Sequence, residues 1–495
     1  MLKISTILQM KLQKKQKLLI VATVFIIITW GARLLYSSNR SRDLNVILIT
    51  IDALRADHLG CNGYKRNTSP NINKLANEGI LFTQVIGQGM NTFASLPSII
   101  TSTYPYTHKV LSCGDAIDSS CEIITEILKN QGYSTGLISG YNLLAKIGGL
   151  NRGFDTVKYL PSFWGYIEYF FNKWENMLRK FLSIKPDPSE YCFIYDARKI
   201  THLAIKWLSN KKNKPFFLWI HYFEVHGFYK NLPSPYKKMF LYDDFYKGNK
   251  HVPISDSLSN VYGGHGHIPY YISEMCITDL DYYIAQYDAA IRYVDTQIGL
   301  LMEKLKRLNF YNKTIVVLTA DHGESLGEHN FYLDHDSLYD EIIKIPLIIK
   351  CNGILPKGII INSQLESIDI VPTILDILKI KSTKLKGVSL LPLISGRQEQ
   401  PLEHAFSMSS EATSIRTKDW KLIHNLTTDK NELYNLNDDP GELTNLISME
   451  KEKFKFLKRR LDYYLNNLAL SKSIKPKQPL DEYTKEKLRS FGYAQ

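Results

Sequence analysis

The chain has 495 residues, of which 44% are hydrophobic and 22% charged. This length and composition exclude a disordered, collagen-like or coiled-coil chain and leave room for one large domain with a smaller one. Lys and Arg outnumber Asp and Glu by 61 to 49, but residues 1–42 hold eight of the basic residues and no acidic one. The remainder of the chain is close to neutral, so we expect no nucleic-acid partner.

Residues 18–36 form the apolar run LLIVATVFIIITWGARLLY. As a helix this run would span about 28 Å, close to the thickness of a bilayer core. Five lysines precede it, and only Arg33, Arg40 and Arg42 lie at or shortly beyond its far end. The positive-inside rule then predicts a cytoplasmic basic tail over residues 1–17, a single transmembrane anchor over 18–36 and an extracytoplasmic catalytic domain. A cleaved signal peptide is the alternative, which the bulky residues after Arg33 disfavour.

Short apolar runs alternate with helical patterns after residue 42. The runs are rich in Val, Ile and Leu, as in buried parallel strands. They lie at residues 46–51, 135–139, 216–220, 315–319 and 346–349. Amphipathic spacing predicts helices over residues 122–130 and 288–308. We therefore predict an α/β fold with an open, mostly parallel sheet sandwiched by helices, in a catalytic domain over residues 43–353.

The pattern changes to short strands and turns from about Ile354. This region contains IRTKDWKLI from Ile415 and the turn DDPGE from Asp438. It predicts a smaller C-terminal antiparallel-sheet subdomain over residues 354–470, which ends in a charged helix, followed by a tail over residues 471–495. The six cysteines are too few for a disulfide framework, and only Cys113 and Cys121 are close enough in sequence to suggest a bridge.

Acidic and histidine side chains follow two of the predicted strands. Asp52 ends the first strand, and Asp321 and His322 follow the strand at residues 315–319. Ligands collect at the carboxyl ends of strands in open α/β sheets. Carboxylate and imidazole donors together suit Mn²⁺, Zn²⁺ or Ca²⁺, so the pattern predicts a metal site there.

Two histidines and two hydroxyl residues elsewhere in the sequence are further candidates for the site. His226 follows the strand at residues 216–220 and is interpreted as a substrate-facing acid or anion binder, whereas His221 is interpreted as a packed, hydrogen-bonded residue. Thr92 and Ser95 open an apolar helix, whose dipole would stabilise an alkoxide or the anion that it attacks. A helix cap is the alternative interpretation of these hydroxyl groups.

Taken together, several segments resemble the sulfatase branch of the alkaline phosphatase superfamily. They occur in one order between Asn45 and Leu446. They are NVILITIDALRADHLG from Asn45, SPNINKLANEGILFT from Ser69, TSTYP from Thr101, YDAAIRYVDTQIG from Tyr287, LTADHGESLGEH from Leu318, LYDEIIKIPLII from Leu338 and LYNLNDDPGELTNL from Leu433. The resemblance implies a metal-dependent hydrolase of sulfate or phosphate esters with the alkaline phosphatase fold.

The resemblance also implies site residues. It implies one bound divalent metal ion, Ca²⁺, Mn²⁺ or Zn²⁺. Its ligands would be Asp52, Thr92, Asp321 and His322. Thr92 would attack the ester in line and form a covalent intermediate. His226 and His335 match positions whose basic residues contact the anion or protonate the leaving group.

The nucleophile segment departs from the sulfatase pattern. Sulfatases carry a formylglycine made from Cys or Ser in a pattern similar to C-x-P-S-R, about twelve residues before a Tyr-Pro pair, and here Thr92 lies twelve residues before Tyr104. Threonine is not a substrate for that oxidation, whereas phosphodiesterases and phosphoglycerol transferases of the superfamily use a Thr nucleophile. A second register puts Ser95 in the Cys position, with Ile99 in place of Arg. The acid that usually follows Asp52 is replaced by Ala53, which disfavours Ca²⁺.

Three alternatives to a Thr92 hydrolase stay open at this point. An acceptor alcohol in place of water would make the protein a phosphoglycerol or phosphoethanolamine head-group transferase. Oxidation of Ser95 would make it a formylglycine sulfatase, and a non-catalytic ectodomain could keep the same fold. Two long insertions rich in Tyr and Phe, at residues 158–195 and 229–283, interrupt the predicted α/β pattern. Together with the predicted membrane tether, they lead us to expect a small-molecule, glycan or lipid-linked ester as substrate.

Overall fold

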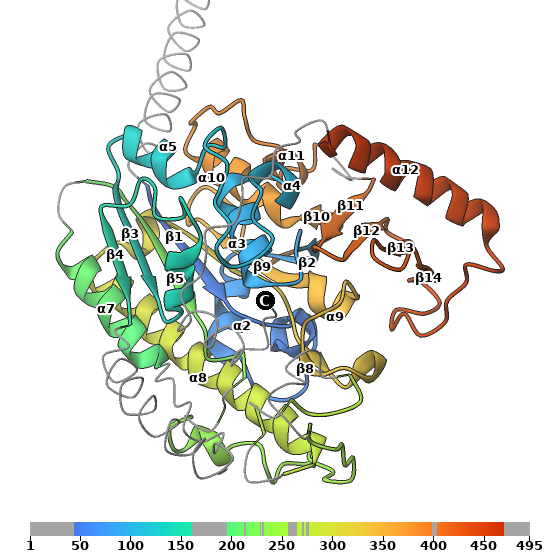
Figure 1. The fold of residues 1–495 in the computed structure, drawn as a ribbon. Coiled ribbons are helices and arrows are strands. Elements are labelled where there is room, and N and C mark those ends of the chain that lie inside the picture. Colours follow the sequence, from blue (N-terminus) through green and yellow to red (C-terminus); the bar gives the residue numbers. More distant parts are fainter. Residues whose placement is uncertain are drawn as a thin grey trace, which may run out of the picture.

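The computed structural model describes residues 44–160, 196–211, 214–227, 229, 232–255, 265–269, 272–273, 277–397 and 403–469. Its centre is an eight-stranded mixed sheet with the order β10-β2-β9-β6-β1-β5-β3-β4, placed among helices (Figure 1). The strands are β1 (Asn45–Ile51), β2 (Ile80–Ile86), β3 (Ser134–Ser139), β4 (Thr156–Tyr159), β5 (Phe216–Tyr222), β6 (Thr314–Ala320), β9 (Lys344–Lys350) and β10 (Ile359–Glu366). The helices that accompany them are α2 (Pro70–Asn77), α3 (Thr92–Thr101), α4 (Pro105–His108), α5 (Ile124–Asn130), α7 (Ala197–Ser209), α8 (Leu280–Arg307), α9 (Asp340–Ile343), α10 (Ile370–Ile377) and α11 (Leu391–Ile394).

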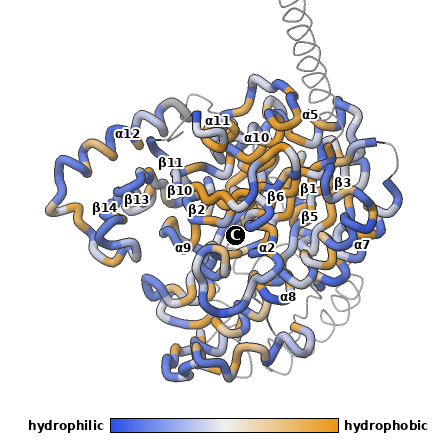
Figure 2. The backbone as a smooth tube through the Cα atoms, turned by 180° about the vertical axis from the view of Figure 1, so that it is seen from behind, coloured by the Kyte–Doolittle hydropathy of each residue, from blue (hydrophilic) through white to orange (hydrophobic). Residues whose placement is uncertain are grey.

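Three strands of the larger sheet are buried along their whole length, namely β1, β5 and β6. β1 pairs in parallel with both of the others, so the carboxyl ends of all three lie side by side. Figure 2 shows hydrophobic residues concentrated in this central region of the sheet. Burial of these apolar side chains is the main contribution to folding in this region, and it places the residues after the three strands at one edge.

The predicted fold class is confirmed with one correction. The apolar runs form β1, β3, β5, β6 and β9, and the predicted helices correspond to α5 and α8. β9, however, is antiparallel to both β2 and β6. The run at residues 346–349 was therefore correctly predicted as a strand but wrongly predicted as parallel, because a fully buried apolar run carries no information about its direction.

A second, four-stranded antiparallel sheet with the order β11-β12-β13-β14 lies beside the first. Its elements are β11 (Ala405–Met408), β12 (Ala412–Arg416), β13 (Trp420–Asn425) and β14 (Asn431–Asn435), and helix α12 (Lys451–Ala469) packs on it through Leu457 and Leu461. The predicted boundary at residue 354 precedes β10, which is a strand of the larger sheet. The small sheet itself therefore begins at Ala405.

The remaining predictions concern the two ends of the chain and a possible disulfide bond. The basic tail, the anchor at residues 18–36 and the C-terminal tail over 471–495 lie outside the described residues, and the anchor stays a prediction. Within the described segments, no helix combines the length and the apolar character needed to cross a membrane. Cys113 and Cys121 are both free thiols, so the suggested bridge is not formed.

Candidate active site

The buried carboxylate of Asp52 directly follows β1 and lies where the neighbouring strands β5 and β6 also end. The Asp52 N–H donates to the carbonyl oxygen of Tyr222, the last residue of β5, at 2.9 Å. Ala53 then turns the chain with a φ of 54°, a conformation that non-glycine residues rarely adopt. The Ala53 N–H donates to Asp321 Oδ1 at 3.3 Å. These contacts hold the ends of β1 and β5 and the loop after β6 together around Asp52.

Asp321 and His322 directly follow β6, and both are fully buried. His322 Nε2 lies 3.4 Å from Asp52 Oδ1 and 3.8 Å from Asp321 Oδ2. The chain can turn here because Gly323 follows, since a Cβ at that position would lie 2.0 Å from the carbonyl oxygen of Glu341. The ligand atoms of Asp52, Asp321 and His322 all lie within 4.8 Å of one another, and we refer to these three residues as the metal cluster.

The hydrogen bond of His322 Nδ1 determines which ring nitrogen can bind a cation. Nδ1 lies 2.8 Å from the carbonyl oxygen of Gly323. Since a carbonyl oxygen can only accept, Nδ1 carries the proton, and Nε2 presents its lone pair to Asp52 and Asp321. A neutral imidazole with Nδ1 held by a carbonyl group is the usual state of a metal-binding histidine.

The charge balance of the metal cluster fits a divalent cation. Asp52 Oδ1 and Asp321 Oδ2 are buried and have no hydrogen-bond partner among the described residues. Burial raises the pKa of Asp52 well above its ordinary value, and the nearby Asp321 carboxylate raises it further. A divalent ion would supply the missing partner for both oxygens and offset their repulsion. The residues present therefore fit a bound metal ion.

Thr92 places a hydroxyl group against the metal cluster. It is the first residue of α3, whose N-terminus is capped by the Asn91 side chain accepting from the Ala94 N–H at 3.0 Å. Thr92 Oγ1 donates to Asp52 Oδ2 at 3.2 Å and lies 3.4 Å from His322 Nε2. Negative charge on this oxygen would be stabilised by the helix N-terminus.

The other candidate hydroxyl group, that of Ser95, lies one turn further along α3. It is buried, and its Oγ has no hydrogen-bond partner within the described part of the chain. A Cβ on Gly89 would lie 2.9 Å from this oxygen, so Ser95 faces the segment that precedes the helix. Of the two hydroxyl groups, Thr92 is the one in contact with Asp52 and His322.

His226 and His335 lie next to the metal cluster. The rings of His335 and His322 stack with centroids 4.5 Å apart, and the His226 ring meets the His335 ring edge-on at 5.1 Å. Burial lowers the pKa of His226 to about 3 and lowers that of His335 well below its ordinary value, and the nearby His322 ring lowers both further. Both rings are therefore neutral until an anion lies beside them, which would favour their charged form. Their catalytic roles stay predictions.

Two other histidines have positions that sequence reasoning did not establish. His221 is buried in β5, and its Nε2 lies 3.4 Å from Asp52 Oδ2, so it touches the metal cluster. The sequence carries no signal for this contact, which depends on the pairing of β5 with β1. His329, which follows His322 in the same loop, stacks on Tyr339 with centroids 3.5 Å apart.

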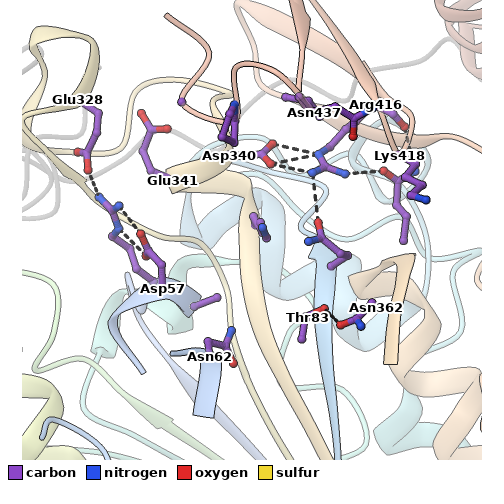
Figure 3. Close-up of a pocket in the computed structure, with 18 residues that line it drawn as sticks. Asp57, Asn62, Thr83, Glu328, Asp340, Glu341, Asn362, Arg416, Lys418 and Asn437 are labelled. Carbon is purple, nitrogen blue, oxygen red and sulfur yellow. Dashed lines mark hydrogen bonds and ion pairs between the residues drawn. The ribbon is translucent and has the colours of Figure 1, made fainter. Parts of the chain in front are cut away.

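A cavity of about 740 Å³ lies between the two sheets (Figure 3). Arg55 binds Asp57 and Glu328 on one wall, and Arg416 binds Asp340 on the other. None of the six predicted site residues lines this cavity. It is therefore a feature of the interface between the sheets and separate from the metal cluster.

Comparison with known families decides the relationship. Residues 44–380, more than half of the chain, match the family model described as "Sulfatase". The chain belongs to the sulfatase family. This confirms the resemblance, and the protein is a hydrolase of that family. Residues 327–470 of this sulfatase also match the model "N-sulphoglucosamine sulphohydrolase, C-terminal", which includes the small sheet and α12.

Known sulfatases and related hydrolases resemble the chain over most of its length. The N-acetylglucosamine-6-O-sulfatase of Bacteroides thetaiotaomicron is 24% identical, over 86% of this chain and 87% of the relative. BT4656, solved in complex with D-glucosamine-2-N,6-O-disulfate, superposes with a TM-score of 0.65 at 21% identity, over 88% of this chain and 99% of that one. The phosphonate monoester hydrolase of Agrobacterium radiobacter gives a TM-score of 0.65 at 21% identity, over 86% and 95% of the two chains. The two structures show that the fold is shared.

Removal of metal ion is expected to destabilise this sulfatase. Chelation followed by dialysis should lower the thermal midpoint, and Mn²⁺ returned at a hundred times its Kd should restore about 2.7 kcal/mol of unfolding free energy. Asp321→Asn keeps the shape of the side chain but removes the charge, so the midpoint of this variant should no longer respond to Mn²⁺. Asp376→Asn, at an exposed position on α10, is the control and should respond as the wild type does. An equal response in Asp321→Asn would contradict the assignment of the metal cluster.

Proposed function

We propose that this protein is a metal-dependent hydrolase of sulfate or phosphate esters in which Thr92 is the nucleophile. The observation that carries the proposal is the position of Thr92 Oγ1, 3.2 Å from Asp52 Oδ2 and 3.4 Å from His322 Nε2, at the N-terminus of α3. When bound by Asp52, Thr92, Asp321 and His322, a divalent ion would lower the pKa of the hydroxyl group and neutralise the ester oxygens.

In the first step, Thr92 Oγ1 attacks the sulfur or phosphorus atom. The new bond from oxygen forms as the bond to the leaving oxygen breaks on the opposite side. Asp52 Oδ2, which already accepts the hydroxyl hydrogen of Thr92, is placed to take this proton. The product is a covalent sulfate or phosphate ester of Thr92.

In the second step, water attacks the same atom and the bond to Thr92 breaks, so the proton taken in the first step returns to the Thr92 oxygen. One of His226 and His335 gives a proton to the leaving oxygen in the first step, and the ring left neutral takes the proton that the attacking water gives up in the second. Both imidazoles are neutral in the free protein, and the negative charge of a bound ester raises their pKa toward the range in which they can donate.

The nitrogen donor and the single strand-end acid support Mn²⁺ or Zn²⁺ as the metal ion. His322 contributes an imidazole, and Ala53 stands where a second carboxylate would otherwise lie. Ca²⁺ prefers six to eight oxygen ligands, whereas Mn²⁺ and Zn²⁺ accept mixed oxygen and nitrogen donors.

Two observations bear on the substrate. The relative from B. thetaiotaomicron is named for an N-acetylglucosamine 6-O-sulfate, and BT4656 was solved with a disulfated glucosamine. These names support a glycan ester as the substrate class. The unmodified hydroxyl of Thr92 supports phosphate as well as sulfate esters, as does the likeness to a phosphonate monoester hydrolase.

The test is hydrolysis by the full chain of an aryl sulfate, an aryl phosphate monoester and an aryl phosphate diester, each with Mn²⁺, Zn²⁺ or Ca²⁺. We expect turnover of at least one ester that chelation abolishes and Mn²⁺ or Zn²⁺ restores. Mass spectrometry of the peptide that carries Ser95 is run on the same sample. Sulfate turnover that requires formylglycine at Ser95 would contradict the proposed nucleophile.

A further inference from the structure

A chain of buried polar groups leads from the interior of the larger sheet to the metal cluster. Thr50 lies on β1 opposite His221 on β5, and Trp219 is two residues before His221. All three side chains are fully buried. Trp219 Nε1 donates to Thr50 Oγ1 at 2.9 Å, and Thr50 Oγ1 lies 2.9 Å from His221 Nδ1. On its other side, His221 Nε2 lies 3.4 Å from Asp52 Oδ2.

The hydrogen-bonding capacities of these groups determine where the protons lie. An indole N–H can only donate, so Thr50 Oγ1 accepts from Trp219. The single hydroxyl proton of Thr50 then has His221 Nδ1 as its acceptor. Because Nδ1 accepts, the proton of the neutral ring is on Nε2. Nε2 makes no hydrogen bond to a described residue, and Asp52 Oδ2 lies 3.4 Å from it.

The opposite tautomer would be unfavourable at Thr50. Its buried hydroxyl proton would lose the acceptor that His221 Nδ1 provides. Buried polar groups without a partner are costly and rare. The fixed indole donor of Trp219 therefore selects the tautomer at His221.

We propose that His221 is a positioning residue, held as the Nε2-protonated tautomer by Thr50 and Trp219 so that its N–H orients the Asp52 carboxylate for metal binding. His221 Nε2 lies on the Oδ2 side of this carboxylate, whereas Oδ1 is the oxygen near His322 Nε2. This inference rests on the metal site of the proposed function. In this proposal, the register that pairs Thr50 with His221 serves to fix the tautomer of His221.

The test compares variants of His221 in the full chain by calorimetric titration with Mn²⁺, without substrate. His221→Phe keeps a planar ring but removes the donor, and we expect Mn²⁺ to bind about 10- to 100-fold more weakly. His221→Gln places an amide N–H near the position of Nε2, and we expect its affinity within about threefold of the wild type. His424→Phe, a buried histidine of β13, is the control for general effects of this replacement and should leave the affinity unchanged.

Ring ¹⁵N chemical shifts of histidine provide a second readout. The His221 signals are identified by their loss in His221→Gln, and we expect the pattern of an Nε2-protonated ring. Thr50→Val removes the hydroxyl donor with little change of shape, and we expect the pattern to shift toward the other tautomer. This measurement keeps the proposal testable if His221→Phe fails to fold.

The outcomes separate this inference from the proposed function. Wild-type affinity for Mn²⁺ in His221→Phe, or a ring proton on Nδ1 in the wild type, would overturn the role of His221 and leave the metal site in place. A wild-type chain that binds none of Mn²⁺, Zn²⁺ and Ca²⁺ would contradict the proposed function itself.

Discussion

Thr92→Ala is expected to lower kcat for ester hydrolysis by at least about a thousandfold at saturating metal ion, because it removes the attacking oxygen. Saturating metal is required because Thr92 is also a proposed metal ligand. Thr92→Ser keeps the hydroxyl group on the same α3 N-terminus, and its kcat should remain within about tenfold of the wild type. The measurement is initial-rate kinetics on the best ester found in the substrate comparison.

Ser95→Ala is the matched control, since it removes a buried hydroxyl from the same helix. Because no described group bonds Ser95 Oγ, we expect kcat to change by less than about twofold. The reverse result, with activity lost in Ser95→Ala and kept in Thr92→Ala, would show that the nucleophile is at Ser95.

Asp340→Ala is expected to lower the free energy of unfolding by about 3–5 kcal/mol, as measured by urea denaturation. Asp340 joins the two sheets by binding Arg416 at 2.8 Å and Lys421 at 2.9 Å, and Figure 3 shows its contact with Arg416. The side chain of Lys421 is 0% exposed and that of Arg416 is 5% exposed. Without Asp340, these buried cations lose the carboxylate that they share.

The control for Asp340 is Glu452→Ala on α12. Glu452 binds Lys455 at 2.7 Å, but its side chain is 84% exposed, so we expect no measurable loss of stability. An equally small effect of Asp340→Ala would show that the ion cluster does not contribute to joining the sheets.

The effect of Asp340→Ala should also depend on pH in a defined direction. Burial alone would raise the pKa of Asp340, but the Arg416 and Lys421 cations outweigh burial and hold the pKa well below its ordinary value. A carboxyl group with a lowered folded-state pKa stabilises the protein above its unfolded-state pKa of about 3.9, and this contribution is lost only as pH falls through the folded value. The difference between wild type and variant should thus shrink in strong acid.

The central strands could be predicted from sequence because burial on both faces requires an uninterrupted apolar run. β1 and β6 are such runs, and Asp52 and Asp321 were recognised because polar residues that directly follow buried strands gather at one edge. β10 was not recognised as part of the larger sheet, because its first residues are exposed and its pattern resembles that of the short strands after it. Strand direction, as in β9, depends on the connections and not on the residues themselves.

The contacts around Asp52 show where sequence reasoning ends. The donor types could be identified, and the resemblance identified Thr92, His226 and His335 as candidates. The contact of His221 with Asp52 could not be derived, because it depends on the register of two strands and on the tautomer that Trp219 imposes. Strand register and histidine tautomers can be determined only when the hydrogen-bond partners of each buried group are known.

The position of β1 in the sheet has a consequence for how the protein is made. β1 begins at Asn45, but its two neighbours are β5 and β6, which end at Tyr222 and Ala320. During synthesis, this apolar strand leaves the ribosome well before β6 and has no partner on that side until β6 has been translated. Pairings over such long separations form slowly, and an unpaired apolar strand is prone to aggregate. The nascent chain therefore exposes this strand until β6 emerges, and the metal cluster, which combines Asp52 with Asp321 and His322, can be complete only after that point.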